Sequence, residues 1–185
     1  MGYFSKIYEL FNKNTTEVAV NELKNQLERR SRMRIEARRG TCALIIDDSP
    51  TIVFALRKIL QSAGYRTLEA LDAEQGVELA RAERPDIIFL DIVLPGMNGF
   101  TALRLLRRDP LTQPIPVIMM SSNEQATEQF FGSRIGADDF MKKPFSRLEV
   151  FARIERLLGE DLVPHRNRVA TAGIETHLGS NLTGL

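Results

Sequence analysis

The stretch DIIFLDIVLPGMNG, residues 86–99, contains the most strand-like run in the chain and the loop that follows it. Its first part, 86–91, is a short apolar run bounded by acids and predicts a buried strand. Its last part, 94–99, is rich in turn residues, and leucines then mark a helix, with Leu103, Leu105 and Leu106 on it. The sequence therefore predicts a strand, a loop and a helix in this order.

The same unit repeats on both sides of this stretch. Upstream, ALIID (43–47) is a continuous apolar run ending in acid, which is typical of a strand buried on both faces of a parallel sheet. The predicted strands are 43–47, 65–70, 86–91, 116–120 and 138–142. The first predicted helix starts at Pro50, with Ser49 as its N-cap, and is stopped by Gly64. The third contains Leu103, and the other three cover residues 73–83, 124–135 and 147–158. This alternation implies parallel pairing with right-handed crossovers, and hence a three-layer α/β sandwich.

Length and composition restrict the protein class. The chain has 185 residues, 25 Lys and Arg, 24 Asp and Glu and a formal charge of +1, which suits one globular domain with modest extensions. No apolar run approaches the roughly 20 residues that span a bilayer. The single Cys42 excludes an intrachain disulfide framework and a multi-Cys zinc site. These features favour a reducing compartment, the cytoplasm.

Chemically reactive side chains follow the predicted strands at their carboxyl ends, which meet at one edge of a parallel sheet. They are Asp47 and Asp48, Asp91, Ser121 and Ser122, and Lys142, Lys143 and Pro144. Three carboxylates that converge there repel one another unless a cation lies among them, and Mg²⁺ suits oxygen ligands. A carboxylate beside Mg²⁺, with an ammonium and a hydroxyl nearby, can accept a phosphoryl group. Asp91 is the predicted nucleophile.

Four motifs together carry a resemblance to a known family. They are IIDDS at 45–49, FLDIVLPGMNG at 89–99, PVIMMSS at 116–122 and ADDFMKKPFS at 137–146. Over about residues 41–159 the chain resembles the receiver domain of two-component response regulators, and is similar to the single-domain chemotaxis and twitching-motility regulators. The resemblance implies a flavodoxin-like (βα)5 fold, with five parallel strands in the order 2-1-3-4-5.

The resemblance also implies the phosphorylation chemistry. Asp91 would receive a phosphoryl group from the phosphohistidine of a histidine kinase or a phosphotransfer protein. Asp48 would bind Mg²⁺ directly and Asp47 mostly through water, with Asp91 and the Val93 carbonyl as further ligands. Lys143 would contact the phosphoryl oxygens.

A switch is implied by the same resemblance. Ser121, rather than Ser122, and Lys143, rather than Lys142, match the family's spacing. The Ser121 hydroxyl would move toward the phosphoryl oxygens, and Phe140 would turn into the space that it leaves. The face formed by the fourth helix, fifth strand and fifth helix would change as a result. The family also makes a cis bond before Pro144 plausible, which could aim the lysine.

The flanks carry no such motif. Residues 1–40 have nine Lys and Arg against five acids, and YFSKIYELF (3–11) places its aromatic and aliphatic side chains on one helical stripe. We expect a helical, basic arm that docks on the receiver or on a second copy, recognises a partner protein, or, least favoured, lies on an anionic membrane. Residues 160–185 have little periodicity and are expected to form a largely disordered tail.

The leading hypothesis is therefore a phospho-acceptor signalling protein that acts through protein contacts and is not an enzyme. Its output partner is unknown, and a homodimer through the arm or through the switch face is possible. No nucleic-acid partner is expected, because no binding module is recognisable. The alternative is a receiver-fold scaffold, assembled through the arm, with vestigial phosphorylation. An aspartate-nucleophile phosphatase would need a second Asp where the chain has Val93.

Overall fold

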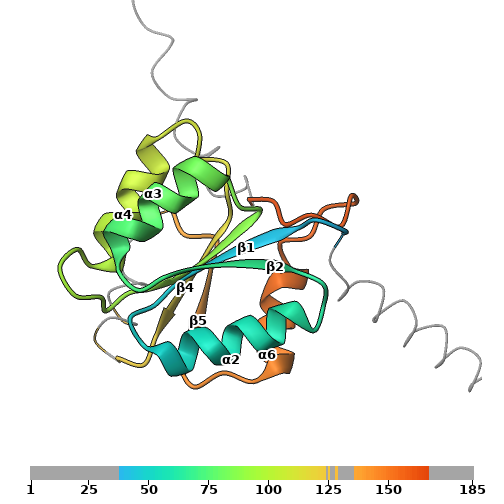
Figure 1. Cartoon of the computed structure of the whole chain (residues 1–185), viewed down its shortest axis with the longest axis horizontal. Coiled ribbons are helices and arrows are strands. Elements are labelled where there is room, and N and C mark those ends of the chain that lie inside the picture. The colour runs from blue at the N-terminus through green and yellow to red at the C-terminus, as the bar shows by residue number, and fades with distance from the viewer. Residues whose placement is uncertain (1–37, 124, 126–127, 129–135, 167–185) are drawn as a thin grey trace, which may run out of the picture. The chain divides into compact units, whose positions relative to one another are not determined.

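The computed structural model describes residues 38–123, 125, 128 and 136–166. This part of the chain contains five strands and four helices, and a helix follows each strand except β4 (Figure 1). The strands are β1 (Cys42–Ile46), β2 (Arg66–Ala70), β3 (Ile87–Asp91), β4 (Val117–Ser121) and β5 (Asp139–Lys142). The helices are α2 (Pro50–Gln61), α3 (Ala73–Glu83), α4 (Gly99–Arg108) and α6 (Arg147–Glu155).

All neighbouring strands of the sheet are parallel, in the order β2-β1-β3-β4-β5. The strand order and the α/β class agree with the prediction. The register pairs Ile46 with Leu90, Asp91 with Met120 and Ser121 with Lys142. The ends of β1, β3, β4 and β5 therefore lie at one edge of the sheet.

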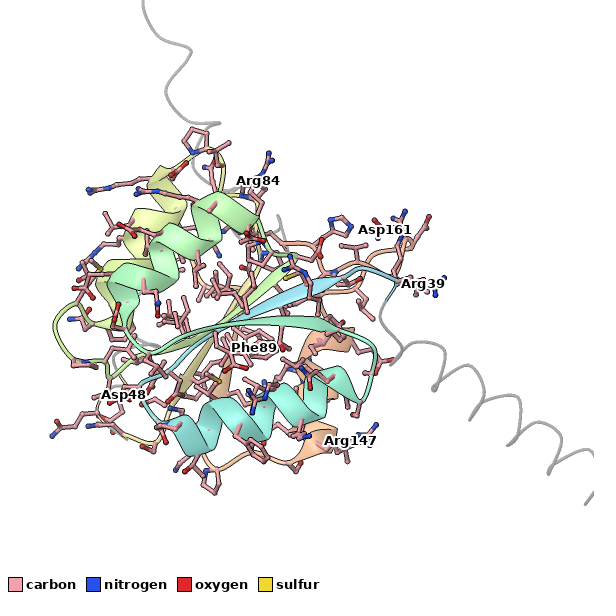
Figure 2. All side chains as sticks on the ribbon, viewed as in Figure 1. Arg39, Asp48, Arg84, Phe89, Arg147 and Asp161 are labelled. Carbon is pink, nitrogen blue, oxygen red and sulfur yellow. The ribbon has the colours of Figure 1, made fainter. Side chains whose placement is uncertain are left out.

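The helices cover the sheet on both faces, α2 and α6 on one and α3 and α4 on the other (Figure 1). Side chains of a strand point alternately to the two faces. Leu44, Ile88 and Met119 belong to the core cluster under α3 and α4, which includes Val77 and Leu103. Figure 2 shows Phe89, which is fully buried, between the sheet and α2. Burial on both faces explains the continuous apolar runs of β1, β3 and β4.

Side-chain caps fix where three helices begin. Asp72 accepts from Gln75 N at 2.7 Å in α3, Asn98 from Thr101 N at 2.9 Å in α4, and Ser146 from Glu149 N at 3.2 Å in α6. Helix α2 differs from these three. Ser49 occupies its N-cap position, as the sequence predicts, but the serine side chain makes no capping hydrogen bond, and Pro50 supplies the first turn.

Helix α3 has the predicted bounds, whereas several other element ends differ from the prediction by one to three residues. Helix α2 ends at Gln61 rather than at Gly64, and α6 ends at Glu155 rather than at residue 158. In both cases a turn follows in which hydrogen bonds join residues three apart, such as Gly64 N to Gln61 O at 3.0 Å and Leu158 N to Glu155 O at 3.3 Å. The predicted helix 124–135 falls largely outside the described residues, as does the arm up to residue 37.

The predicted tail begins differently from the expectation. Residues 160–166 are described, and they fold back on the end of α6, with a bridge between Leu158 and Pro164. Gly159 N donates to Val163 O at 2.9 Å and His165 N to Leu157 O. Local hydrogen bonds, which hydrophobic periodicity does not reveal, hold this short hairpin together. Residues 167–185 lie outside the described part.

No helix within the described residues has the length and apolar character needed to cross a membrane.

Candidate functional site

The carboxyl edge of the sheet brings together the acidic residues singled out in the sequence. Asp47 follows β1 directly and is fully buried, Asp91 is the last residue of β3 and is 5% exposed, and Asp48 is exposed. Figure 2 shows Asp48 beyond the end of β1, where α2 begins. One carboxylate oxygen from each of the three lies within 4.8 Å of the other two. Three carboxylates so close together offer oxygen ligands of the kind that a hard cation takes.

Lys143 places its ammonium between the two buried carboxylates. Its Nζ lies 2.5 Å from Asp47 Oδ2 and 2.8 Å from Asp91 Oδ2, and its side chain is 9% exposed. Asp47 Oδ2 has no hydrogen bond among the described residues, so the ion pair is its polar contact. Asp47 Oδ1 accepts from Ser49 N at 3.0 Å. The ammonium of Lys143 pairs with two of the three carboxylates, so the cluster carries more negative charge than the lysine neutralises.

Burial raises the pKa of the Asp91 carboxyl above its ordinary value. The hydrogen bond and the charge of Lys143 act in the opposite direction, and the charge of Asp47 adds to the increase. A cation bound among these carboxylates would favour the ionised form of Asp91. Together with Lys143, such a cation would offset the effect of burial on this carboxyl.

The loop after Asp91 is closed against the site by backbone contacts. Val93 N donates to Asp91 Oδ1 at 3.3 Å, and Gly99 N donates to Ile92 O at 2.9 Å. A Cβ at Gly99 would lie 2.0 Å from the Asp91 carbonyl oxygen, so α4 can begin this close to Asp91 only because residue 99 is glycine. Val93 belongs to this loop, and its side chain is exposed. Its backbone carbonyl is the group singled out in the sequence analysis.

Sequence reasoning missed Glu74, which lies in the first turn of α3. Its Oε1 accepts from Met97 N at 3.2 Å and lies beside Gly96, whose φ is +70°. Glu74 therefore connects the loop after Asp91 to α3, the helix that precedes β3 in the chain. Nothing in the spacing of the sequence indicates this contact, because an acid in a first helical turn is ordinary.

Ser121 ends β4 at this edge of the sheet, whereas Phe140 lies on β5 two positions before Lys142, which is in register with Ser121. Ser121 is fully buried, its Oγ accepts from Asn123 N at 3.0 Å, and its carbonyl accepts from Lys143 N at 2.9 Å. Phe140 is 7% exposed and belongs to the core cluster under α3 and α4. Ser122 and Lys142, the residues set aside in the sequence, are exposed.

The peptide bond between Lys143 and Pro144 is cis. It joins the residue that carries the ammonium to the loop that leads into α6.

The fold and this edge define a receiver domain. The family model of the response regulator receiver domain matches residues 43–155, and the chain belongs to this family. It is a receiver of two-component signalling, in which such domains interact with histidine kinases and output proteins.

Curated relatives fall into two kinds. The chain is 42% identical to the protein PilH of Pseudomonas aeruginosa over 115 residues, which cover 62% of this chain and 95% of PilH. It is 43% identical to the DNA-binding regulator RpaA of Synechocystis, but covers 48% of it. With the phosphate regulon regulator PhoB of P. aeruginosa the identity is 39% over 52% of that protein. The chain therefore spans about half the length of these two regulators.

Solved structures share the fold. The chemotaxis protein CheY4 of Vibrio cholerae is 27% identical, with a TM-score of 0.59 over 64% of this chain and 99% of that one. The receiver domain of the P. aeruginosa sensor kinase PA1611 is 30% identical, with a TM-score of 0.57 over 63% of this chain and 95% of that one. That structure has a magnesium ion in its active-site cleft.

Proposed function

We propose that this protein is a phospho-acceptor response regulator in which Asp91 receives the phosphoryl group. The observation that carries the proposal is the position of Asp91 Oδ2, 2.8 Å from the Lys143 ammonium and within a cluster of three carboxylates. Membership of the receiver family supports the same assignment.

The residues at this edge fit a magnesium ion. Asp47, Asp48 and Asp91 offer carboxylate oxygens within 4.8 Å of one another, and their charge exceeds that of Lys143. Oxygen ligands of this kind, completed by water, are what Mg²⁺ accepts. The three side chains and the Val93 carbonyl are the proposed ligands. Bound there, the ion would neutralise charge on the phosphoryl oxygens.

The transfer needs no further reactant. A carboxylate oxygen of Asp91 attacks the phosphorus of a phosphohistidine, a P–O bond forms, and the P–N bond breaks as the imidazole leaves with its electron pair. Lys143 supplies positive charge beside the oxygens on which negative charge accumulates.

The proposed switch uses two neighbouring strands. Ser121 lies at the carboxyl end of β4, and Phe140 lies on β5 in register with Met119. Phe140 is already buried in this structure, so movement of the Ser121 hydroxyl toward the phosphoryl group would stabilise this inward position and fix the face that includes β5 and α6 in one arrangement. Partner proteins would read this face, so the protein signals through contacts rather than through catalysis.

The proposed domain arrangement is an arm over 1–40 and a receiver over 41–159, as in the sequence analysis, but residues 160–166 pack on the receiver and the proposed tail follows them. We propose a cytoplasmic location, in agreement with the single Cys42, which is buried. The alternative is a scaffold that assembles through the arm and in which phosphorylation is vestigial, and it expects no change in partner affinity on phosphorylation.

The test is transfer of a labelled phosphoryl group from a histidine phosphotransfer protein, or from acetyl phosphate, to the full chain with Mg²⁺. We expect labelling of the wild type and none of Asp91→Asn. Asp72→Asn is the matched control, because Asp72 follows β2 at the same edge and asparagine caps a helix as well as aspartate does. Labelling that survives Asp91→Asn would refute the proposal.

A further inference from the structure

A second charge cluster lies at the opposite end of the sheet, around Asp138. This residue precedes β5, and its carboxylate is 2% exposed. Its Oδ2 accepts from Arg107 Nη2 at 2.7 Å and from Val117 N at 2.8 Å. Asp138 thus fixes the start of β5 to the start of β4 and to the end of α4.

Arg166, which lies beyond α6, completes this cluster. Its Nε donates to Asp138 Oδ1 at 3.1 Å, its Nη1 to Gln113 O at 3.1 Å, and its Nη2 to Gly136 O at 3.3 Å. We call these three acceptors, on Asp138, Gln113 and Gly136, the seat of Arg166. The planar guanidinium group of arginine has the several N–H donors that such a set of acceptors needs. The side chain of Arg166 is 25% exposed, so the seat is at the surface.

Residues 157–166 form a hairpin that positions Arg166 beside these acceptors. His165 N donates to Leu157 O, and the His165 ring lies 3.0 Å from Asp161 Oδ1 across the turn. Pro164 is buried and pairs with Leu158. Figure 2 shows Asp161 at the end of the sheet opposite to Asp48. The hairpin lies beyond residue 155, where the match to the family model ends.

The hydrogen bonds of Arg166 in this seat are opposed by the nearby charge of Arg107. Arg107 also bonds the carbonyls of Gln113 and Gly136, so two guanidinium groups share the same acceptors and one carboxylate. Burial lowers the pKa of Arg107 to about 10, and the charge of Arg166 contributes to the decrease. The repulsion between the two cations opposes the hydrogen bonds of Arg166, so its release costs less than the loss of a solitary ion pair.

Strand β5 connects this seat to the phosphorylation site. Asp138 lies immediately before its first residue, Phe140 lies on it, and Lys143 follows its last residue. The path from Asp138 to Lys143 spans roughly 16 Å at the rise of a β-strand. A carboxylate held by two arginines thus anchors one end of the strand, and an ammonium held by two carboxylates anchors the other.

We propose that Arg166 closes a clasp on the receiver that positions β5, and with it Lys143 and Phe140, for binding of the phosphoryl group. This inference rests on the proposed function and adds a regulatory role for the segment 157–166. Closure would favour the arrangement in which Phe140 is buried and Lys143 points at Asp91. Opening would loosen β5 and weaken the hold on phosphoryl oxygens.

The experiment compares the full-length wild type with Arg166→Gln and Arg166→Lys, and uses Arg168→Gln as the charge-matched control. Beryllofluoride with Mg²⁺, a mimic of the phosphoryl group, is titrated into each protein. Backbone amide exchange is measured at His165 and Gly159, which donate within the hairpin. We expect Arg166→Gln to expose both amides and to weaken beryllofluoride binding about threefold to tenfold. The affinity of Arg166→Lys for beryllofluoride should lie between those of the wild type and Arg166→Gln. Arg168→Gln should match the wild type in both measurements.

The two readouts separate failure of the clasp from failure of the proposed function. If wild type and Arg166→Gln bind beryllofluoride equally, the coupling is refuted while the phosphorylation site stands. If the hairpin amides are protected equally in both, Arg166 does not close the hairpin. If beryllofluoride does not bind the wild type, the proposed function itself is wrong, and the coupling falls with it.

Discussion

Lys143 Nζ lies 2.8 Å from Asp91 Oδ2, although Asp91 ends β3 and Lys143 follows β5, which is not a neighbour of β3 in the sheet. The side chain of Lys143 passes the end of β4 to reach the end of β3. This ion pair joins the proposed acceptor to the strand that carries Phe140, and so connects the chemistry of the site to the strand expected to move.

Replacement of Lys143 by methionine tests the role of the ammonium. The change keeps an unbranched side chain but removes the positive charge beside Asp47 and Asp91. We expect the rate of phosphorylation from acetyl phosphate to fall about 100-fold, as when one group that stabilises transition-state charge is removed. Lys142→Met, at an exposed neighbouring position, should keep the wild-type rate. Equal rates in wild type and Lys143→Met would contradict the assignment.

Mg²⁺ should stabilise the folded protein by binding the carboxylate cluster. A ligand at 100 times its dissociation constant adds about 2.7 kcal/mol to the free energy of unfolding. Thermal unfolding should therefore shift upward by several degrees between EDTA and saturating Mg²⁺. Asp48→Asn, which changes an exposed member of the cluster, should reduce the shift, and Asp72→Asn should preserve it. A shift that is unchanged in Asp48→Asn would place the ion elsewhere.

The raised pKa of Asp91 predicts a dependence of stability on pH. Since the pKa in the folded state lies above that in the unfolded state, the folded state binds more protons between the two values. Its stability contribution is therefore complete below the unfolded pKa and is lost as pH rises through the folded pKa. In EDTA at neutral pH, Asp91→Asn should be more stable than the wild type, and the difference should shrink on acidification. Urea unfolding at several pH values measures this, and a variant less stable at neutral pH would show that Lys143 outweighs burial.

Gly99→Ala should disrupt the site although residue 99 carries no chemistry. The new Cβ would lie 2.0 Å from the Asp91 carbonyl oxygen, so the backbone of α4 or β3 must move. We expect a loss of at least about 3 kcal/mol in unfolding free energy, at the upper end of single substitutions, together with slow phosphorylation.

Gly64→Ala provides the comparison for Gly99→Ala. Gly64 has a φ of +85°, but a Cβ added there would meet no atom within 4 Å, so only the strain of the left-handed conformation applies. That strain is about 1–2 kcal/mol. If Gly64→Ala proves the more damaging of the two, the close approach of α4 to Asp91 is not the constraint described.

Much of the fold and of the site could be predicted, because both follow local rules. Strands buried on both faces are continuous apolar runs, and the residues that follow them, Asp47, Asp91 and Lys143, must share one edge. The strand order required the family resemblance, since periodicity does not say which strand lies at the centre. The Asn98 cap and Gly99 stand in the turn-rich loop, which locates the start of α4 only approximately.

The remaining features depend on contacts between distant residues with ordinary local patterns. Glu74 reaches Met97 across 23 positions, and Arg166 reaches Asp138 across 28. Neither side chain interrupts a periodicity or forms a motif, so no local rule could select it. The hairpin 157–166 escapes sequence-based prediction for the same reason, because backbone hydrogen bonds rather than apolar residues define it.

The most direct test of the central claim is to locate the phosphoryl group. The full chain is phosphorylated in the presence of Mg²⁺, the acyl phosphate is reduced with borohydride, and peptides are sequenced by mass spectrometry. The account predicts conversion of Asp91 to homoserine in the peptide that contains it, with Asp47 and Asp48 unchanged. Homoserine at another aspartate, with Asp91 intact, would contradict it.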